Sequence, residues 1–215
     1  MRLVIAILLL TTPLCAEGIL IYDQDERALL TGLSVCDPLE CTLVDTVDVR
    51  PSPAFSDWAE TLTRFNVTVS QSSTLGLSRI ELEGSASAPA LDFCRPCSYG
   101  GGTSAATVFF RASELSNLTL LGEADGASVQ LFRDAPVGSP EFFNTLNTPI
   151  DFAGLLDADQ VYVLVVSAAA STRIGSRNDA RYDLAVSVTP IPEPSTATVL
   201  ALSIAAIAAS RRCGY

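Results

Sequence analysis

Apolar and polar residues alternate along much of the chain, in short segments separated by turn-forming residues. The alternation is strict over residues 65–69 (FNVTV), 128–132 (SVQLF) and 181–188 (RYDLAVSV). A period of two is that of a half-buried β-strand, because successive side chains of a strand point to opposite faces of the sheet. Residues 161–166 (VYVLVV) are apolar at every position, which predicts a central strand covered on both faces.

Further strand candidates are shorter or interrupted. Residues 107–112 (TVFFRA) and 118–121 (LTLL) are predicted to be short strands. In residues 75–84 (LGLSRIELEG) the apolar parity shifts, which predicts a bulge or bend near Ser78 and Arg79. Roughly eight strands with Gly, Pro, Asn and Asp turns, and no long stretch of period 3.6, predict an all-β protein. The expected architecture is an antiparallel β-sandwich of jelly-roll type.

Residues 17–62 are less regular but contain strand candidates of their own. Residues 19–22 (ILIY) and 42–49 (TLVDTVDV) are predicted to be strands, whereas residues 25–30 (DERALL) are expected to form one or two helical turns. Trp58 is predicted to anchor the core or the contact between sheets, in preference to stacking on a sugar.

Residues 1–16 (MRLVIAILLLTTPLCA) have the pattern of a secretory signal peptide. A charge at Arg2 precedes an apolar run, and a small residue, Ala16, follows. The run is too short to remain as a membrane anchor, and cleavage after Ala16 is expected. Lipidation of Cys15 is the alternative that we favour less.

A second targeting pattern lies near the other end of the sequence. Its parts, in order, are Pro192, Glu193 and Pro194, the apolar residues 195–210, and Arg211 and Arg212. As a helix, the apolar stretch would be about 24 Å long, short of the ~30 Å hydrocarbon core unless the bilayer thins. The arginines would lie on the cytoplasmic side. A buried core helix is disfavoured because the stretch has no polar face.

This tail resembles the PEP-CTERM sorting signal of Gram-negative bacteria, in which a Pro-Glu-Pro motif, a short transmembrane helix and a basic cluster follow one another. The resemblance implies that Pro192, Glu193 and Pro194 are recognised by an exosortase, a membrane cysteine peptidase that removes the tail near the motif. It also implies a hydrophobic C-terminal helix over residues 195–210, with Arg211 and Arg212 as the membrane stop. The implied destination, after export through the inner membrane, is the cell envelope, the cell surface or an exopolysaccharide matrix.

With both ends removed, residues 17–190 have the size of one domain with a proper hydrophobic core. The expected parts are a strand-containing segment, 17–62, which belongs to the same domain as the β-sandwich 63–189, and the sorting tail 190–215. The chain has 13 Lys and Arg against 24 Asp and Glu, a net charge of −11, and no histidine. Nucleic acid is not an expected partner, because phosphate binding needs concentrated positive charge. An acidic surface favours solubility outside the cell and weak association with divalent cations.

Four cysteines remain when Cys15 and Cys213 leave with the two ends: Cys36, Cys41, Cys94 and Cys97. In an oxidising envelope an even number of cysteines usually forms disulfides. Among three connectivities we prefer the local pairs, Cys36 with Cys41 and Cys94 with Cys97. A four-thiolate zinc site is less favoured, because it needs a reducing compartment or early metal loading. A redox role for the CRPC pair is also less favoured, because loop-forming residues surround it.

The sequence offers no recognisable catalytic constellation. There is no histidine to act as general base and no Gly-x-Ser-x-Gly nucleophile elbow. Glu81 and Glu83 share one face of a predicted strand and are the candidates for a glycosidase carboxylate pair, but an ordinary solvent face is preferred. We therefore expect a protein that is not an enzyme and needs no cofactor.

Two acidic groups leave calcium binding open. They are Asp157 with Asp159, and Asp23 with Asp25 and Glu26. Neither group matches an EF-hand loop, so turn and surface roles are favoured.

Residues 84–106 are predicted to be a long loop, kept flexible by Gly100, Gly101 and Gly102, with Tyr99 as the nearest candidate for sugar stacking. The main functional hypothesis is a non-enzymatic surface or exopolysaccharide-matrix protein that is briefly anchored in the membrane and processed by an exosortase. The alternative is a calcium-assisted carbohydrate-binding module.

Overall fold

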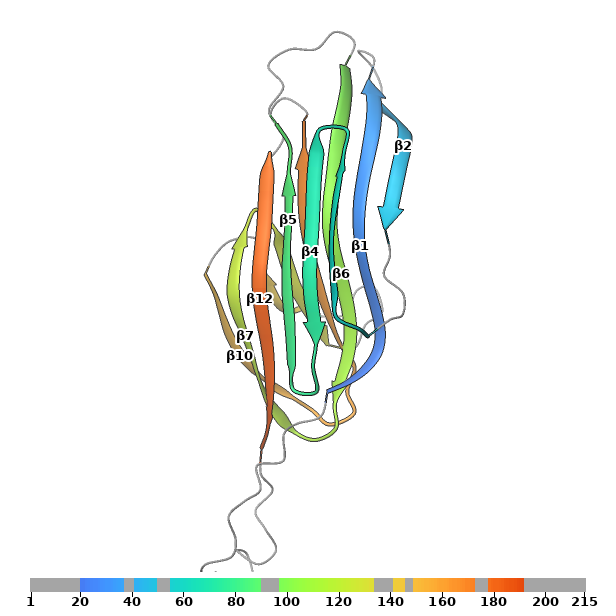
Figure 1. Ribbon diagram of the computed structural model, residues 1–215. Helices are drawn as coiled ribbons and strands as arrows, with labels where there is room; N and C mark the ends of the chain where they lie inside the picture. Colours follow the sequence, from blue (N-terminus) through green and yellow to red (C-terminus); the bar gives the residue numbers. More distant parts are fainter. Residues whose placement is uncertain are drawn as a thin grey trace, which may run out of the picture.

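The computed structural model describes residues 20–36, 41–49, 55–89, 97–133, 141–145, 149–172 and 178–191 (Figure 1). Only the backbone is described for residues 35–36, 41–49, 97–98 and 141–145. Strands and turns make up these ranges, and none of their residues belongs to a helix that could cross a membrane. The predicted signal peptide 1–16, the motif 192–194, the predicted helix 195–210, and Arg211 and Arg212 lie outside the described residues.

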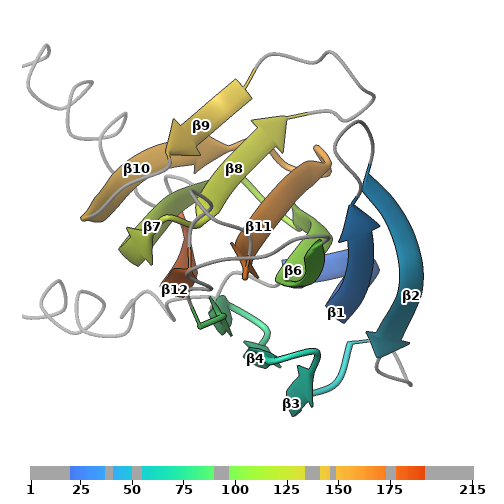
Figure 2. The same ribbon diagram turned by 90° about the horizontal axis from the view of Figure 1, so that it is seen from above.

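The described ranges form twelve strands in two antiparallel sheets. The strands are β1 (Leu20–Cys36), β2 (Cys41–Val49), β3 (Trp58–Arg64), β4 (Val67–Leu75), β5 (Arg79–Ser87), β6 (Cys97–Ala112), β7 (Ser116–Asp125), β8 (Ser128–Arg133), β9 (Glu141–Thr145), β10 (Ile150–Leu156), β11 (Tyr162–Ser171) and β12 (Asp179–Pro190). Sheet A has the order β2-β1-β6-β11-β8-β9, and sheet B has the order β10-β7-β12-β5-β4-β3. Figure 2 looks onto the strand ends and shows the two sheets as the two layers of a β-sandwich.

The pairing of the last eight strands is nested. β5 pairs with β12, β6 with β11, β7 with β10 and β8 with β9, so this part of the chain is one long hairpin rolled into two layers. We call β5 to β12 the rolled unit. β1 and β2 extend sheet A beside β6, and β3 and β4 extend sheet B beside β5. Residues 17–62 thus supply strands to both sheets, and the boundary drawn between residues 62 and 63 falls inside β3.

Alternating segments fold as the pattern predicts. Val129 and Leu131 of β8, and Leu184 and Val186 of β12, point into the core, and polar neighbours lie on the outer faces. β11 lies between β6 and β8, which confirms a central strand. Both of its faces are covered at its start, where three consecutive residues are buried, but the outer face is partly exposed from Val165 onward.

The prediction of helical turns over residues 25–30 is wrong, because these residues lie within β1. Arg27 and Leu29 are buried in the interior, and β1 pairs with β6 from Leu20 to Cys36. This long-range pairing overrides the weak local preference of alanine and leucine for a helix.

Most of residues 84–106 is strand, so the predicted long flexible loop is wrong. β5 continues to Ser87 and β6 begins at Cys97. A Cβ on Gly100 would lie 2.1 Å from the backbone oxygen of Phe65, and one on Gly102 would lie 2.6 Å from Cγ1 of Val67. Glycine is therefore required here for close approach between β4 and β6 across the interior.

The two hairpin turns of sheet B were predicted with mixed success. The bend near Ser78 is confirmed as the β4–β5 turn, where the backbone N of Gly76 donates to the carbonyl of Arg79 at 2.8 Å. Phe65 was predicted to begin a strand, but it lies in the β3–β4 turn. Phe65 and Asn66 have φ values of 55° and 60°, as a type I′ hairpin turn requires.

A buried ion pair joins β1 to the segment that leads into β3. The guanidinium of Arg27 donates to both carboxylate oxygens of Asp25, at 2.7 and 2.8 Å. It also donates to the carbonyl of Ser56 and to Oγ of Ser73, each at 2.7 Å. Its Cζ lies 5.9 Å from the ring centroid of Trp58, which packs against the core. The prediction that Trp58 is a core anchor is confirmed.

The first and last described residues lie at the same end of the sandwich, which we call the terminal end. Leu20 pairs with Ala112 and Pro190 pairs with Ser116, and a short bend joins those two partners. In Figure 1 the dark-blue start of β1 and the red-orange finish of β12 are both at the bottom.

Candidate functional site: the outer face of sheet B

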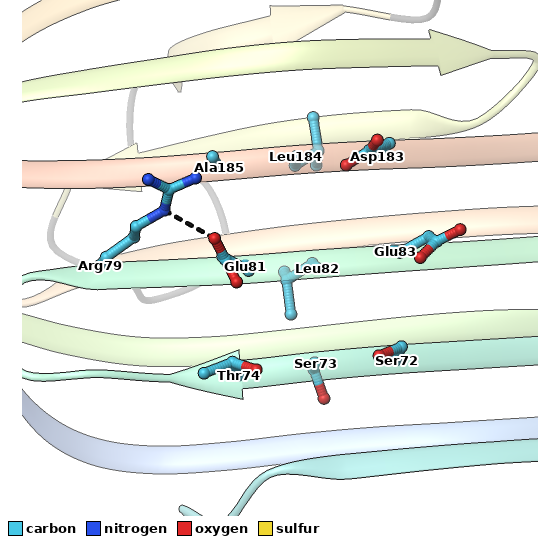
Figure 3. A pocket seen from close by; sticks show the side chains of 10 residues that line it. All are labelled: Ser72, Ser73, Thr74, Arg79, Glu81, Leu82, Glu83, Asp183, Leu184 and Ala185. Atoms are coloured by element: carbon cyan, nitrogen blue, oxygen red, sulfur yellow. Dashed lines mark ion pairs between the residues drawn. The ribbon is translucent and has the colours of Figure 1, made fainter.

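Three neighbouring hollows lie on the outer face of β3, β4, β5 and β12, with volumes of about 250, 320 and 210 Å³. Glu83 lines all three, and Figure 3 shows the first. We call this surface the polar face. It presents the hydroxyls of Ser70, Ser72, Thr74 and Ser85, the carboxylates of Glu81, Glu83, Glu123 and Asp183, and the guanidiniums of Arg79 and Arg181.

Strand alternation explains why these groups share one face. In β4 and β5 every second residue is buried, so the residues between them point outward. Cross-strand pairing then sets neighbours side by side, and the Oγ atoms of Ser70 and Ser85 are 2.8 Å apart.

Three carboxylates form a row across adjacent strands. Asp183 of β12 is directly opposite Glu83 of β5 on one side and Glu123 of β7 on the other. Figure 3 shows Asp183 and Glu83 next to each other, with Ser72 continuing the row on β4. Like charges directly opposite each other destabilise a sheet. A bound group that donates hydrogen bonds or carries positive charge would offset this repulsion.

The carboxylates Glu81 and Glu83 lie on this solvent face, as preferred from the sequence. Glu81 forms an ion pair with Arg79 at 2.8 Å, and both side chains are more than half exposed, at 51% and 57%. Neither carboxylate lies in the enclosed, water-poor environment that tunes a glycosidase acid.

Three of the five acidic residues considered for calcium form ion pairs with arginines, and a fourth, Glu26, accepts a hydrogen bond from Gln24. Asp23 accepts two hydrogen bonds from Arg111, at 2.7 and 2.8 Å, and this contact raises the pKa of the Arg111 guanidinium. Asp25 is held by Arg27, and Asp157 forms an ion pair with Arg133. Asp159 lies in a turn with φ of 60°. Across the described part of the chain, no three His, Cys, Asp or Glu residues are grouped so that they could hold a metal ion.

The aromatic candidate for sugar stacking is not near the polar face. Tyr99 lies in β6 of sheet A, opposite Ser34 of β1. Tyr182 borders one hollow, but its ring points inward, where its hydroxyl lies 3.1 Å from Oγ of Ser104. Burial raises the pKa of Tyr182 to about 12. Among the described residues that line the hollows, none offers an exposed ring to a sugar.

The cysteines of the predicted disulfides are described in part. Cys36 is directly opposite Cys41 of β2 and also directly opposite Cys97 of β6, whereas Cys94 lies outside the described residues. Opposed residues of antiparallel strands have Cα atoms roughly 4.5–5.5 Å apart, which is within the range of a disulfide. The register is therefore compatible with Cys36–Cys41 and with Cys36–Cys97, and the pairing stays a prediction.

The sequence did not single out Ser70, Ser72, Glu123, Arg181 or Asp183. Each occupies the outward position of a strand, and for β12 that pattern was visible in the sequence. What the sequence lacked was the order of strands in the sheet, which brings β7, β12, β5 and β4 together.

Comparison of the chain with protein-family models and with curated proteins finds no match. The function is therefore argued from the fold, the polar face and the two ends of the sequence.

Proposed function

We propose that this protein is an exported, non-enzymatic component of the cell surface or exopolysaccharide matrix, held in the membrane by a C-terminal helix until an exosortase removes the tail. The observation that carries the proposal is the position of the first and last described residues. Leu20 and Ile191 both lie at the terminal end, so a tether there leaves the outer faces of both sheets open.

The fold supports removal of both predicted targeting segments. Among the described residues, those that build the buried core lie between Leu20 and Val188, within the expected mature domain of residues 17–190. The nested pairing of β5 with β12, β6 with β11, β7 with β10 and β8 with β9 supports a sandwich of jelly-roll type.

The polar face is the surface that we assign to association with the matrix. Polysaccharides present many hydroxyl groups, and this face offers hydroxyl, carboxylate and guanidinium partners for them along four adjacent strands. Its hollows are shallow and polar, whereas enclosed small-molecule sites are mostly apolar. This chemistry favours recognition over catalysis.

Processing is tested by replacing Glu193 with Ala in the organism that encodes the protein. We expect Glu193→Ala to remain in the membrane at precursor size, while Thr196→Ala, just beyond the motif, is shortened and released as usual. Immunoblots of membrane and medium fractions measure both. Release of Glu193→Ala at the normal size would sink the exosortase proposal.

Association is tested by co-sedimentation of the released protein with the exopolysaccharide of the same organism. We expect the double variant Glu83→Gln, Asp183→Asn to lose binding several-fold, and Gln130→Ala, on the outer face of sheet A, to keep it. Equal binding by all three proteins would remove the polar face from the proposal.

The second candidate is the calcium-assisted carbohydrate-binding module. It is favoured only by the repulsion between Glu83 and Asp183, which lie directly opposite each other, because no three carboxylates of the described residues are grouped so that they could hold an ion. The same co-sedimentation is repeated with calcium and with chelator. Binding that disappears in chelator supports this candidate, and binding that is unchanged rejects it.

A further inference from the structure

Large apolar side chains are exposed at the terminal end. Leu77 in the β4–β5 turn is 68% exposed, Leu115 in the β6–β7 bend is 45% exposed, and Ile21 near the start of β1 is 37% exposed. Phe55, also exposed, stacks on Tyr22 of β1 with ring centroids 6.1 Å apart. We call Ile21, Leu77 and Leu115 the apolar patch.

Backbone hydrogen bonds attach this patch to both chain ends. The N–H of Leu20 donates to the carbonyl of Leu77 at 2.6 Å, and the N–H of Ile191 donates to the carbonyl of Leu115 at 2.9 Å. Leu77 and Leu115 therefore lie next to the first and the last described residues, Leu20 and Ile191.

The predicted membrane helix begins close to this end. It starts at Ser195, and the stretch from Ile191 to Ser195 spans at most about 14 Å when fully extended. The headgroup layer on each side of the hydrocarbon core is roughly 5–8 Å thick. An inserted helix would thus keep the patch within reach of the lipid headgroups.

Two ion pairs lie beside the patch, and Glu114 directly precedes Leu115 in the chain. Arg79 forms an ion pair with Glu81, and Arg111 forms one with Asp23. The carboxylate row is centred on Asp183, in the part of β12 nearer to its start at Asp179 than to its end at Pro190. The carboxylate row is therefore kept away from a lipid surface that faces the terminal end.

We propose that the apolar patch rests on the lipid surface while the chain is tethered, a proposal that depends on the membrane tether of the proposed function. Three side chains bind a bilayer weakly on their own, but the tether gives the contact a high effective concentration. The tethered precursor makes the contact, and the released protein does not.

This contact has two consequences for the precursor. The strands stand away from the membrane, which keeps the polar face open to the matrix. The motif 192–194 is held at the membrane surface, where a membrane peptidase would meet it.

The proposal is tested with the full chain reconstituted into vesicles that contain brominated lipids, which quench nearby tryptophan. Leu77→Trp and Leu115→Trp place reporters in the patch, and Leu121→Trp places the control on the outer face of sheet B, where the leucine is 49% exposed. Every variant also contains Trp58, so the emission of the unaltered chain is subtracted from that of each variant. We expect the quenching at positions 77 and 115 to exceed that at position 121 several-fold.

Flotation of the vesicles after an alkaline wash separates the two proposals. If the chain stays with the vesicles and all three reporters are quenched equally, the lipid contact is wrong and the tether stands. If the chain washes off, both the tether and the contact are wrong. Far-UV circular dichroism confirms that each variant is folded, as expected for substitutions at exposed positions.

Discussion

The interior of the sandwich differs between the rolled unit and the flank built by β1 and β4. In the rolled unit, facing residues such as Val108, Phe110, Leu120 and Leu164 are apolar and fully buried. The flank instead buries polar side chains, namely Arg27, Thr31, Gln71 and Ser73. The rolled unit is thus stabilised by buried apolar area, whereas the flank adds the hydrogen bonds of Arg27 and Ser73 to the apolar contacts of Leu29, Val67 and Val69. Hydrogen-bonded interiors are sensitive to the loss of one partner.

The largest expected effect is at the buried ion pair of the flank. Arg27→Met leaves the Asp25 carboxylate buried without its cation, which costs about 3–5 kcal/mol of unfolding free energy. Arg111→Met breaks the solvent-exposed pair with Asp23 and should cost far less. Denaturant unfolding measures both, and equal losses would contradict the comparison.

Alkaline pH should destabilise the protein through Tyr182, which lies in the rolled unit. Its pKa is raised from 10 to about 12 by burial, so the folded state favours the protonated phenol. The contribution is complete below pH 10 and is lost as the pH rises through 12, a loss of about 2–3 kcal/mol.

Tyr182→Phe should remove that part of the pH dependence when unfolding free energy is followed from pH 9 to 12. The pKa of Tyr22 is raised by burial in the same direction, so Tyr22→Phe is the companion variant. If the unfolding free energy of Tyr182→Phe depends on pH in the same way as that of the unaltered protein, the ionisation of this phenol does not destabilise the folded state.

The close approach of β4 to β6, where flank and rolled unit meet, should tolerate no added methyl group. Gly102→Ala places a Cβ 2.6–2.7 Å from the methyl groups of Val67 and Val69, at a cost of about 1–3 kcal/mol. Gly101→Ala is the matched control, because its Cβ would meet nothing closer than 3.9 Å. Thermal unfolding of the two variants should differ in midpoint, and identical midpoints would mean that the sheets can separate locally.

The smallest effect is a gain in stability. Neither the amide nitrogen nor the amide oxygen of Gln71 has a hydrogen-bond partner, although the residue is only 2% exposed. Gln71→Met keeps the length of the side chain and removes both polar atoms, so unfolding should become harder by about 1 kcal/mol. Ser73→Ala should instead lower the unfolding free energy, because Ser73 accepts a hydrogen bond from Arg27. Destabilisation by Gln71→Met would indicate a partner for the amide.

The rolled unit was easier to predict from the sequence than the flank. β8 and β12 are half-buried, so apolar and polar residues alternate along them and reveal both the strand and its inward face. β1 hides this pattern, because its interior positions include Arg27 and Thr31. The glycines of β6 suggested a loop, and only the contact with Val67 and Val69 explains them.

The polar face was beyond sequence reasoning for a different reason. Glu81 and Glu83 could be placed on one face from local parity alone. The row of Glu83, Asp183 and Glu123 depends on the register of three strands that are far apart in the sequence. The sorting motif, in contrast, can be recognised without knowledge of the fold, because three adjacent residues form it. Its role stays a proposal.

The nested pairing also determines when the chain can fold. The innermost hairpin, β8 with β9, needs only neighbouring residues. β5 can pair early with β4, but its other edge must wait for β12, the last of the described strands. Pairings between strands so distant in sequence close slowly, because a long loop must be ordered before the contact is gained. Sheet B therefore remains incomplete until β12 has been synthesised, because β12 is the strand that joins β7 to β5.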